Sequence, residues 1–319
     1  MKHTPSPTPT ERFKADLLAL LPEPGRPIAL AVSGGPDSVA LLLLAHVAFP
    51  GAIEAMTVDH GLRPESGGEA AQVAAICAGM GVPHHILPVT VAREGEGVQA
   101  AARAARYDAM AARCRAIGAH ALLTAHHADD QAETLMLRLA RGAGIGGLRG
   151  IRPIGDWNGI AILRPLLGWR RSELAAIVSA AGIAAADDPS NRDPHYDRTA
   201  ARALLKDVPW LDPDRLAASA RHLADAEAAL DWTAREAARG RLTREKDAVL
   251  LDAADLPHEL VRRLVLIGLA ELGVPAPEGP SIERLIAALS AGRTATLGGI
   301  RASPGRFWHF SPAPARRSR

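Results

Sequence analysis

Cysteine is scarce in this chain of 319 residues, which has only Cys77 and Cys114. The two lie far apart in the sequence and form no Cys-x-x-Cys motif, which argues against a disulfide framework and against a thiolate metal site. Long apolar runs are also missing. The longest, at residues 39–45, is too short to cross a bilayer, and residues 1–10 lack the apolar core of a signal peptide. We therefore expect a cytoplasmic protein with no membrane partner.

Aromatic residues are rare as well, at 3% of the chain, while alanine is abundant, and this composition favours helix-rich packing. The net charge is only +2, so any contact with nucleic acid must come from local arginine clusters rather than from the whole protein. A hydrophobic content of 48% and a charged content of 23% are typical of a soluble globular protein, and 319 residues suffice for two domains.

Strand-like and helical segments alternate through the first part of the chain. The sequence predicts strands at 28–32, 52–58, 85–89, 121–124 and 160–163, and helices at 37–47, 67–80, 98–117, 128–140 and 170–181. An earlier helix should begin at a capping box formed by Thr8 and Glu11. This alternation indicates an α/β fold, Rossmann-like, with a parallel sheet whose ligand lies at the carboxyl ends of the strands.

The pattern changes near residue 207, after which helical stretches at 213–239, 256–272 and 281–289 dominate, followed by a strand-like tail at 294–310. We therefore predict a disordered N-terminus at 1–8, an α/β domain at 9–208 that would be the catalytic domain of an enzyme of this build, and a smaller, mostly helical domain at 209–312. Residues 313–319 are predicted to form a disordered basic tail.

The most informative segment joins the first predicted strand of the alternation to its helix and reads Ser33-Gly34-Gly35-Pro36-Asp37-Ser38. A glycine-rich turn in this place aims backbone N–H groups and the positive end of the helix at an anion. A Walker loop would need a Lys-Ser/Thr pair after its last glycine, and none is present. Two hydroxyls and a carboxylate around two glycines instead suit a pyrophosphate that carries a metal ion, with Asp37 as the metal ligand.

A second dense segment follows the fourth predicted strand and contains His126, His127, Asp129, Asp130 and Glu133. Asp130 and Glu133 are three residues apart on a helix, so their carboxylates can converge, with His126 one turn away. Such a cluster could bind a divalent metal or clamp a substrate amine. An N-cap explains one aspartate but not the density of the whole segment.

Four further signals are weaker. Asp59 and His60, at the end of the second strand, could approach a nucleoside, although a polar strand end explains them equally well. Arg103, Arg106 and Tyr107 occupy adjoining positions of one predicted helix, where arginine can grip phosphate. A literal Gly-x-Gly-x-x-Gly at 142–147 follows a helix, so we reject a dinucleotide site and predict a loop whose arginines, Arg141 and Arg149, face a phosphate backbone. Asp188–Asn191 predicts a turn into a basic helix with Arg198 and Arg202.

Taken together, these segments resemble the tRNA(Ile)-lysidine synthase family of the PP-loop ATP pyrophosphatases. The matching stretches are residues 33–38, 58–63, 103–107, 125–134, 141–148, 164–167 and 188–191, which span the predicted catalytic domain. The sequence departs from the family in having Arg198-Thr-Ala-Ala-Arg202 and Gly97 at positions where the family usually has other residues. The helical remainder matches only in length and helical character.

The resemblance implies a PP-loop domain that uses ATP and Mg²⁺ to ligate free L-lysine to the wobble cytidine of tRNA(Ile) with a CAU anticodon. It implies that residues 33–38 hold pyrophosphate, that Asp37 and Arg106 are catalytic, and that His126, Asp130 and Glu133 bind lysine. It further implies that Arg141, Arg149, Arg198 and Arg202 contact tRNA, and it is compatible with a homodimer.

Two other functions remain open at this point. A related loop enzyme that thiolates a tRNA base would want a cysteine pair or an iron–sulfur site, which Cys77 and Cys114 do not resemble. An RNA-binding protein with a dead ATP site would not need an intact phosphate loop.

Overall fold

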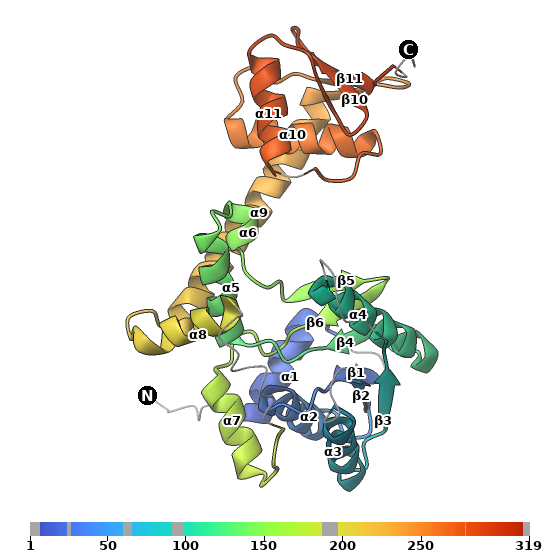
Figure 1. Cartoon of the computed structure of the whole chain (residues 1–319), viewed down its shortest axis with the longest axis vertical. Coiled ribbons are helices and arrows are strands. Elements are labelled where there is room, and N and C mark those ends of the chain that lie inside the picture. Colours follow the sequence, from blue (N-terminus) through green and yellow to red (C-terminus); the bar gives the residue numbers. More distant parts are fainter. Residues whose placement is uncertain are drawn as a thin grey trace. The chain divides into compact units, whose positions relative to one another are not determined.

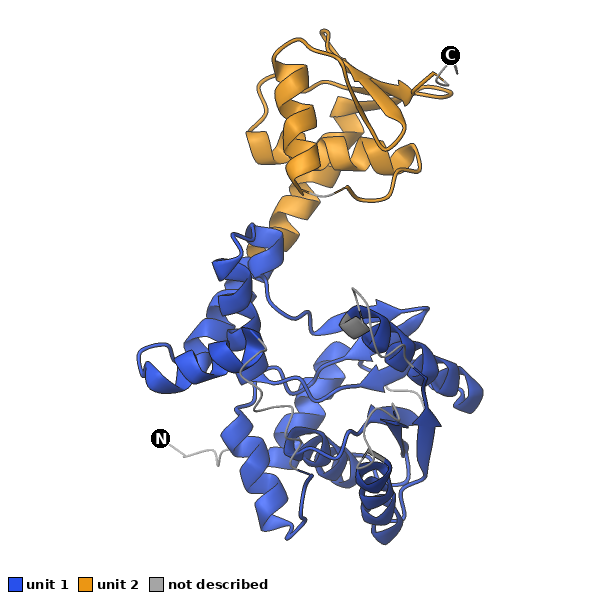
Figure 2. Cartoon of the chain, in the orientation of Figure 1, with its two compact units in different colours: residues 1–224 blue, residues 225–319 orange. Residues whose placement is uncertain are grey.

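A computed structural model of the chain describes residues 7–23, 27–59, 66–90, 98–186, 197–277 and 279–314. The chain divides into two compact units, residues 1–224 and 225–319 (Figure 2). The predicted disordered ends fall largely on residues 1–6 and 315–319, which lie outside the described residues. The predicted domain boundary at 208/209 stays a prediction.

The first unit contains a six-stranded sheet in the order β3-β2-β1-β4-β6-β5 (Figure 1). Its strands are β1 (Ile28–Ala31), β2 (Ile53–Asp59), β3 (His84–Pro88), β4 (Ala121–Leu123), β5 (Ile154–Trp157) and β6 (Ile160–Leu163). All pairings are parallel except that of β5 with β6. The expected α/β class with a parallel sheet is therefore confirmed.

Helices connect these strands and continue beyond them. They are α1 (Pro9–Leu20), α2 (Pro36–Ala48), α3 (Ser66–Gly79), α4 (Val98–Ile117), α5 (Ala128–Ala140), α6 (Ile145–Leu148), α7 (Arg171–Ala180), α8 (Asp197–Asp207) and α9 (Pro213–Arg241). The predicted capping box opens α1, because Glu11 N donates to Thr8 Oγ1 at 3.3 Å and Thr8 N donates to Glu11 Oε2 at 2.8 Å.

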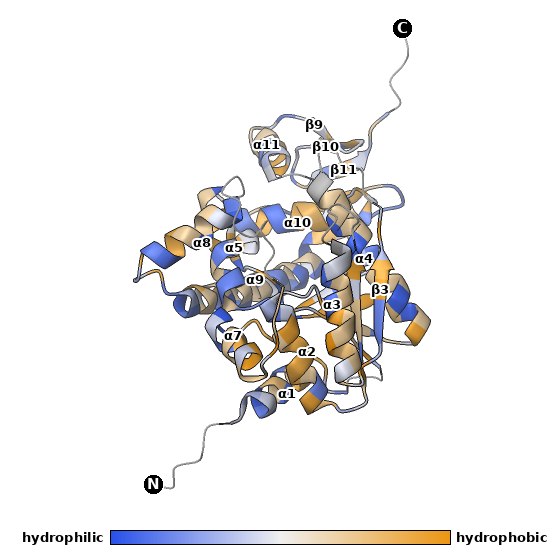
Figure 3. Cartoon of the chain, turned by 60° about the horizontal axis from the view of Figure 1, so that its bottom comes forward, coloured by the Kyte–Doolittle hydropathy of each residue, from blue (hydrophilic) through white to orange (hydrophobic). Residues whose placement is uncertain are grey.

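The sheet separates two hydrophobic clusters. Helices α1, α2, α3 and α7 pack on one face, around Leu30 and Leu123, and α4 packs on the other, around Ala29 and Leu122. Helix α2 is hydrophobic along most of its length (Figure 3), as a helix buried on nearly all sides must be. It begins with Pro36, a residue whose fixed φ suits the first helical position.

Strand order fixes where a ligand can bind. The chain runs outward from β1 through β2 to β3, and then returns to place β4 on the other side of β1. At this reversal the loops after β1 and β4 diverge and leave a crevice at the carboxyl ends of the strands. The loop before α2 and the segment before α5 both lie at this crevice.

The second unit pairs helices with an antiparallel sheet in the order β7-β8-β11-β10-β9. Its elements are β7 (Leu242–Arg244), β8 (Val249–Leu251), α10 (His258–Glu271), α11 (Gly279–Ser290), β9 (Ala295–Leu297), β10 (Ile300–Ser303) and β11 (Trp308–Pro312). A core of its own surrounds Leu264, Leu285 and Phe310. The strand-like tail is present, and β7 with β8 adds a hairpin that the sequence pattern did not predict.

None of the helices in the described part of the chain combines the length and the apolar character that crossing a bilayer requires.

Candidate active site

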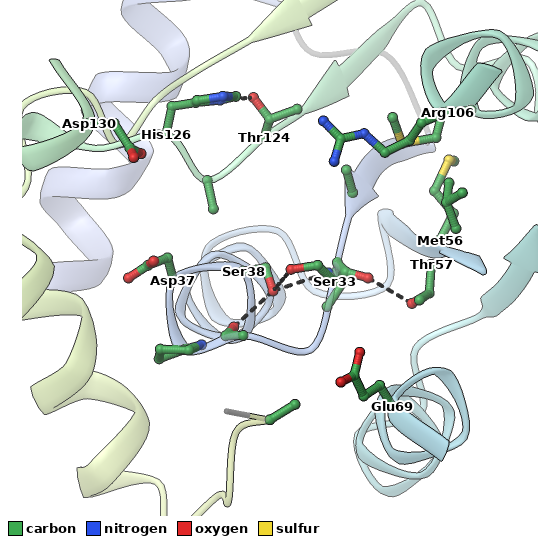
Figure 4. Close-up of a pocket in the computed structure, with 18 of the residues that line it drawn as sticks. Ser33, Asp37, Ser38, Met56, Thr57, Glu69, Arg106, Thr124, His126 and Asp130 are labelled. Carbon is green, nitrogen blue, oxygen red and sulfur yellow. Dashed lines mark hydrogen bonds between the residues drawn. The ribbon is translucent and has the colours of Figure 1, made fainter. Parts of the chain in front are cut away.

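Residues 33–38, here called the phosphate loop, form the turn between β1 and α2. The hydroxyl of Ser38 organises the turn, because Oγ accepts from Ser33 N at 3.1 Å, donates to Gly35 O at 2.9 Å and lies 3.2 Å from Ser33 Oγ (Figure 4). Gly35 is the N-cap of α2 and offers no side-chain cap. Pro36 has no N–H, and Ser38 N and Val39 N donate to Gly35 O at 3.1 and 3.0 Å, so α2 offers an anion the N–H of Asp37 and the positive end of the helix.

Gly34 requires glycine for two reasons. Its φ is +93°, a backbone conformation that side chains rarely adopt, and a Cβ here would lie 3.3 Å from Cγ2 of Val73 in α3. The loop can therefore pass close to α3 and present its backbone to the crevice only with glycine at this position.

A cavity of about 540 Å³ opens beside the phosphate loop, a volume in the range of small-ligand sites. It brings together segments that are far apart in the sequence. Its walls include Ser33 and Asp37 from the loop, Met56–Val58 from β2, Arg103–Tyr107 from α4, Thr124–His126 and Asp130 around the start of α5, and Arg198 and Arg202 from α8. Figure 4 shows His126 and Arg106 across from Ser33 and Ser38.

The α4 wall of the cavity is basic. The guanidinium carbons of Arg103 and Arg106 lie 4.9 and 5.4 Å from the ring centre of Tyr107, which is itself buried. Burial lowers the pKa of Arg106, the neighbouring Tyr107 offsets part of this effect, and Arg103 adds to it. Because arginine stays charged in proteins, this wall holds two cations with free donors.

His126 is a neutral base at the centre of the cavity. Its Nδ1 lies 3.0 Å from Thr124 Oγ1. Burial lowers the pKa of His126 to about 4, which Asp130 opposes and Arg164, Arg198 and Arg103 reinforce. At neutral pH the ring is therefore uncharged and only weakly basic.

His127, which the sequence prediction left without a role, is buried beneath three carboxylates. Its Nε2 lies 3.4 Å from Asp37 Oδ2 and 3.6 Å from Asp130 Oδ2, and its Nδ1 lies 3.6 Å from Asp129 Oδ2. Burial alone would disfavour the charged ring, but Asp129, Asp37 and Asp130 outweigh burial and raise the pKa of His127 to about 10. The imidazolium therefore ties the phosphate loop to the start of α5.

Asp129 is not among the described residues that line the cavity; it links His127 to the start of α7. It accepts from Arg171 N at 2.8 Å and lies 3.4 Å from the Arg170 guanidinium. Burial would raise the pKa of Asp129, but His127, the Arg171 amide and Arg170 together hold it well below its usual range. Asp129 is therefore a permanently charged partner of His127.

Asp130 and Glu133, here called the acidic pair, converge as the spacing predicted, but arginines of α8 meet them. Glu133 is buried and accepts from Arg198 Nε at 3.1 Å and from Arg202 Nε at 2.8 Å. Arg198 Nη2 also lies 3.4 Å from Asp130 Oδ1. Burial acts against the charged form of Arg202, but its hydrogen bond and attraction to Glu133 prevail and raise its pKa.

The remaining predicted residues lie elsewhere or outside the described chain. Arg141 is exposed and paired with Asp197, and Arg149 is half-buried after the short helix α6, so neither is among the described cavity-lining residues. Asp59 ends β2 but is not among them either, whereas Val58 is. The predictions for His60, Gly97 and the 188–191 turn fall outside the described residues.

A divalent cation fits one place in this cavity. Oδ1 of Asp37 is buried without a hydrogen-bond partner, at the positive end of α2. Mg²⁺ characteristically takes one or two carboxylates together with substrate phosphates, so this single unsatisfied oxygen next to a phosphate loop suits it.

The two cysteines do not form a redox or cluster site. Cys77 packs in the cluster on one face of the sheet and Cys114 in the cluster on the other. Burial raises the pKa of each thiol to about 11, so both stay protonated. The thiolating alternative therefore loses the residues that it would need.

Comparison with known proteins supplies the family. A family model described as a PP-loop domain matches residues 9–208. A tRNA(Ile)-lysidine synthase from Zymomonas mobilis subsp. mobilis is 45% identical over 296 residues, covering 91% of this chain and 89% of that protein. One from Novosphingobium aromaticivorans is 45% identical over 311 residues, covering 96% and 94%.

A solved structure adds the fold alone. The U34-tRNA thiolase NcsA from Methanococcus maripaludis, solved with its 4Fe-4S cluster, gives a TM-score of 0.53 at 16% identity, over 67% of this chain and 78% of that one. With a phosphate loop at the carboxyl end of β1, a PP-loop match over residues 9–208 and relatives 45% identical over most of its length, the chain belongs to the tRNA(Ile)-lysidine synthase family.

Proposed function

We propose that this chain is the cytoplasmic ligase that joins L-lysine to C2 of the wobble cytidine in the CAU anticodon of tRNA(Ile), with ATP as the energy source. The product, lysidine, changes the codon read from AUG to AUA and the amino-acid identity from methionine to isoleucine. The observation that carries the proposal is the shared cavity, whose walls include the phosphate loop, Asp130, Arg198 and Arg202. Glu133 does not line this cavity but is buried and holds Arg198 and Arg202 in its wall.

The first half-reaction activates the base. The O2 oxygen of the cytidine attacks the α-phosphorus of ATP, the bond to the bridging oxygen breaks, and pyrophosphate leaves. The backbone of the phosphate loop and the positive end of α2, with Ser33 and Ser38, hold the departing pyrophosphate. Arg106, with buried donors on the opposite wall, neutralises charge that develops at the α-phosphate, and it needs little reorganisation to do so.

Mg²⁺ supports this step. When bound at Asp37 it would neutralise charge on the phosphates. His127 places the other carboxylate oxygen of Asp37, because its Nε2 lies 3.4 Å from Oδ2 and leaves Oδ1 open.

Lysine binds in the half of the cavity that lies beside the acidic pair. A free amino acid carries a carboxylate as well as ammonium groups, and α8 brings two guanidinium groups to the two carboxylates. We assign Asp130 and Glu133 to the ammonium end of lysine. Arg198 and Arg202, predicted from the sequence as tRNA contacts, are better placed to take its carboxylate.

The second half-reaction transfers lysine. The ε-amine attacks C2, the C2–O2 bond breaks, and AMP leaves with that oxygen. The amine must first lose a proton, and a carboxylate of the acidic pair or the imidazole of His126, which borders the cavity, is the group that takes it. Arg141 and Arg149 remain candidates for contacts with tRNA phosphates outside the cavity.

The proposal is tested by incubating the protein with labelled lysine, ATP and total tRNA, followed by nucleoside analysis. We expect label in lysidine, and none when ATP is omitted. A thiolated nucleoside in a parallel reaction that contains a sulfide donor in place of lysine would favour the thiolating alternative, and ATP-independent RNA binding without any product would favour a binding protein.

A further inference from the structure

Three guanidinium groups gather around Tyr107 in the first unit and form what we call the Tyr107 arginine cluster: Arg103, Arg106 and Arg164. Arg103 and Arg106 flank the ring at 4.9 and 5.4 Å. Arg164, in the segment after β6, is only 9% exposed and donates from Nη1 to Arg152 O at 2.7 Å. Burial lowers the pKa of Arg106 and of Arg164, Tyr107 offsets part of this, and the charge of Arg103 adds to it.

The part of the chain that the structure describes gives this cluster no counter-charge. Within the described residues, no carboxylate comes within salt-bridge distance of any of its three members. Other arginines around the cavity behave differently, since Arg198 and Arg202 both meet carboxylates. Nε of Arg106 and Nε of Arg164 are also buried without a hydrogen-bond partner. Arg164 is buried and Arg106 is half-buried, and cations in such places are costly without a counter-charge, so the arrangement indicates anionic ligands.

The phosphates of ATP would balance only part of the positive charge of the Tyr107 arginine cluster. The argument here rests on the proposed function, in which the β- and γ-phosphates lie on the phosphate loop and the α-phosphate takes Arg106. Arg103 is then left over. It is more exposed than Arg106, yet it still lines the cavity, so it stands where a second, larger substrate would enter.

We propose that Arg103 binds a backbone phosphate of the substrate RNA next to the nucleotide being modified. A bidentate guanidinium–phosphate contact there would fix the base against the α-phosphate of ATP. Arg103 is thus a positioning contact to nucleic acid in the wall of the catalytic cavity, separate from the arginines outside it.

The test compares Arg103→Gln with Arg103→Lys and with a matched control, Arg115→Gln, which removes the same charge from an exposed position of α4 outside the cavity. The full chain is titrated with an RNA stem-loop that carries the CAU anticodon, between about 50 and 200 mM KCl. ATP affinity is measured separately without RNA. Thermal unfolding of each variant shows that it is folded.

For Arg103→Gln we expect RNA affinity to fall about tenfold and the slope of log K against log salt to fall by about 0.7, the value for one single-strand phosphate. Arg103→Lys should keep the slope, and ATP affinity and the Arg115→Gln control should stay within about twofold. If Arg103→Gln binds RNA as tightly as a wild type that forms lysidine, this inference is overturned and the proposed function is not. A loss of ATP affinity as large as the loss of RNA affinity would reassign Arg103 to the nucleotide, while a wild-type chain that makes no lysidine would overturn the proposed function instead.

Discussion

At the scale of single residues, two adjacent histidines differ in charge, because His126 is neutral and His127 is positively charged at neutral pH. His126 borders the cavity, and burial, reinforced by basic neighbours, lowers its pKa to about 4. His127 is buried against carboxylates, and its pKa rises to about 10. Neighbouring residues at a strand end point in different directions, so one doublet supplies both a neutral base for the substrate and a fixed cation for the framework.

The His127 assignment predicts a pH-dependent stability. The folded pKa lies above the unfolded value of about 6.5, so the contribution is fully present below that pH and is lost as pH rises toward 10. The free energy of unfolding of the wild type should therefore exceed that of His127→Gln by at most about 5 kcal/mol at low pH, and by much less near pH 10.

Denaturant titrations in EDTA, from pH 6.5 to pH 10, measure this difference. His126→Gln is the matched control, because the lowered pKa of His126 places its own pH dependence below about 6.5. A gap between wild type and His127→Gln that stays constant over this range would show that His127 is not a buried imidazolium.

Local spacing predicted the convergence of the acidic pair, but not its partners. Asp130 and Glu133 are three residues apart, so helix geometry alone places them on the same face of the helix. Arg198 and Arg202 reach Glu133 across separations of 65 and 69 residues. Contacts between residues so far apart in the sequence depend on how α5 and α8 pack, which the sequence pattern does not show. The sequence prediction therefore assigned both arginines to RNA.

At the scale of elements, the glycine-rich segment after α5 is a fixed structure. Gln131 holds it from α5, because its Nε2 donates to Ile151 O at 2.8 Å and its Oε1 accepts from Ile151 N at 2.6 Å. Gly150 has a φ of +68°, and a Cβ there would lie 2.3 Å from Gln131 Oε1. The short helix α6 (Ile145–Leu148) replaces the loop that the pattern predicted at 142–147.

Gly150→Ala should therefore destabilise the protein by about 2–4 kcal/mol, through both backbone strain and the broken Gln131 contacts. Gly142→Ala isolates the two effects, because Gly142 has the same φ of +68° but open space around its Cβ position. We expect about 1 kcal/mol for Gly142→Ala in denaturant unfolding. Equal losses for both variants would mean that crowding at Gln131 has no consequence.

Most of the first sheet could be predicted, because its parallel strands are continuous apolar runs between helices. The antiparallel strand β5 was missed although a signal was present. Asn158-Gly159 joins β5 to β6 with φ values of 51° and 82°, the turn that an Asn-Gly pair favours in two-residue hairpins. The hairpin of β7 and β8 was missed because each strand has only three residues, too few to show the two-residue alternation of a strand.

At the scale of the whole molecule, each unit supplies its own core. The second unit adds a buried ionic network, in which Arg263 meets Glu227 at 2.6 Å, Glu259 at 2.8 Å and Asp231. The first unit contains the entire candidate active site, from the phosphate loop to α8. The central claim is that this one cavity performs two separable half-reactions.

Two substitutions test whether the two half-reactions depend on different parts of the cavity. Asp37→Asn removes a charge from the phosphate loop, and Glu133→Gln removes one from the acidic pair. Asp197→Asn is the matched control, since Asp197 pairs with Arg141 at the surface and both side chains are 67% exposed. An exposed pair of this kind contributes at most about 1 kcal/mol to stability.

The most direct measurement follows ATP labelled at the α-phosphate in the presence of tRNA(Ile) and lysine, and records adenylated RNA and lysidine in the same reaction. For Glu133→Gln we predict adenylated RNA at no less than about a tenth of the wild-type rate, with lysidine reduced at least about 100-fold, whereas Asp37→Asn should lose both. Lysidine formation by Glu133→Gln at the wild-type rate, or equal loss of both products in the two variants, would contradict the division of the cavity into an activating half and a lysine-binding half.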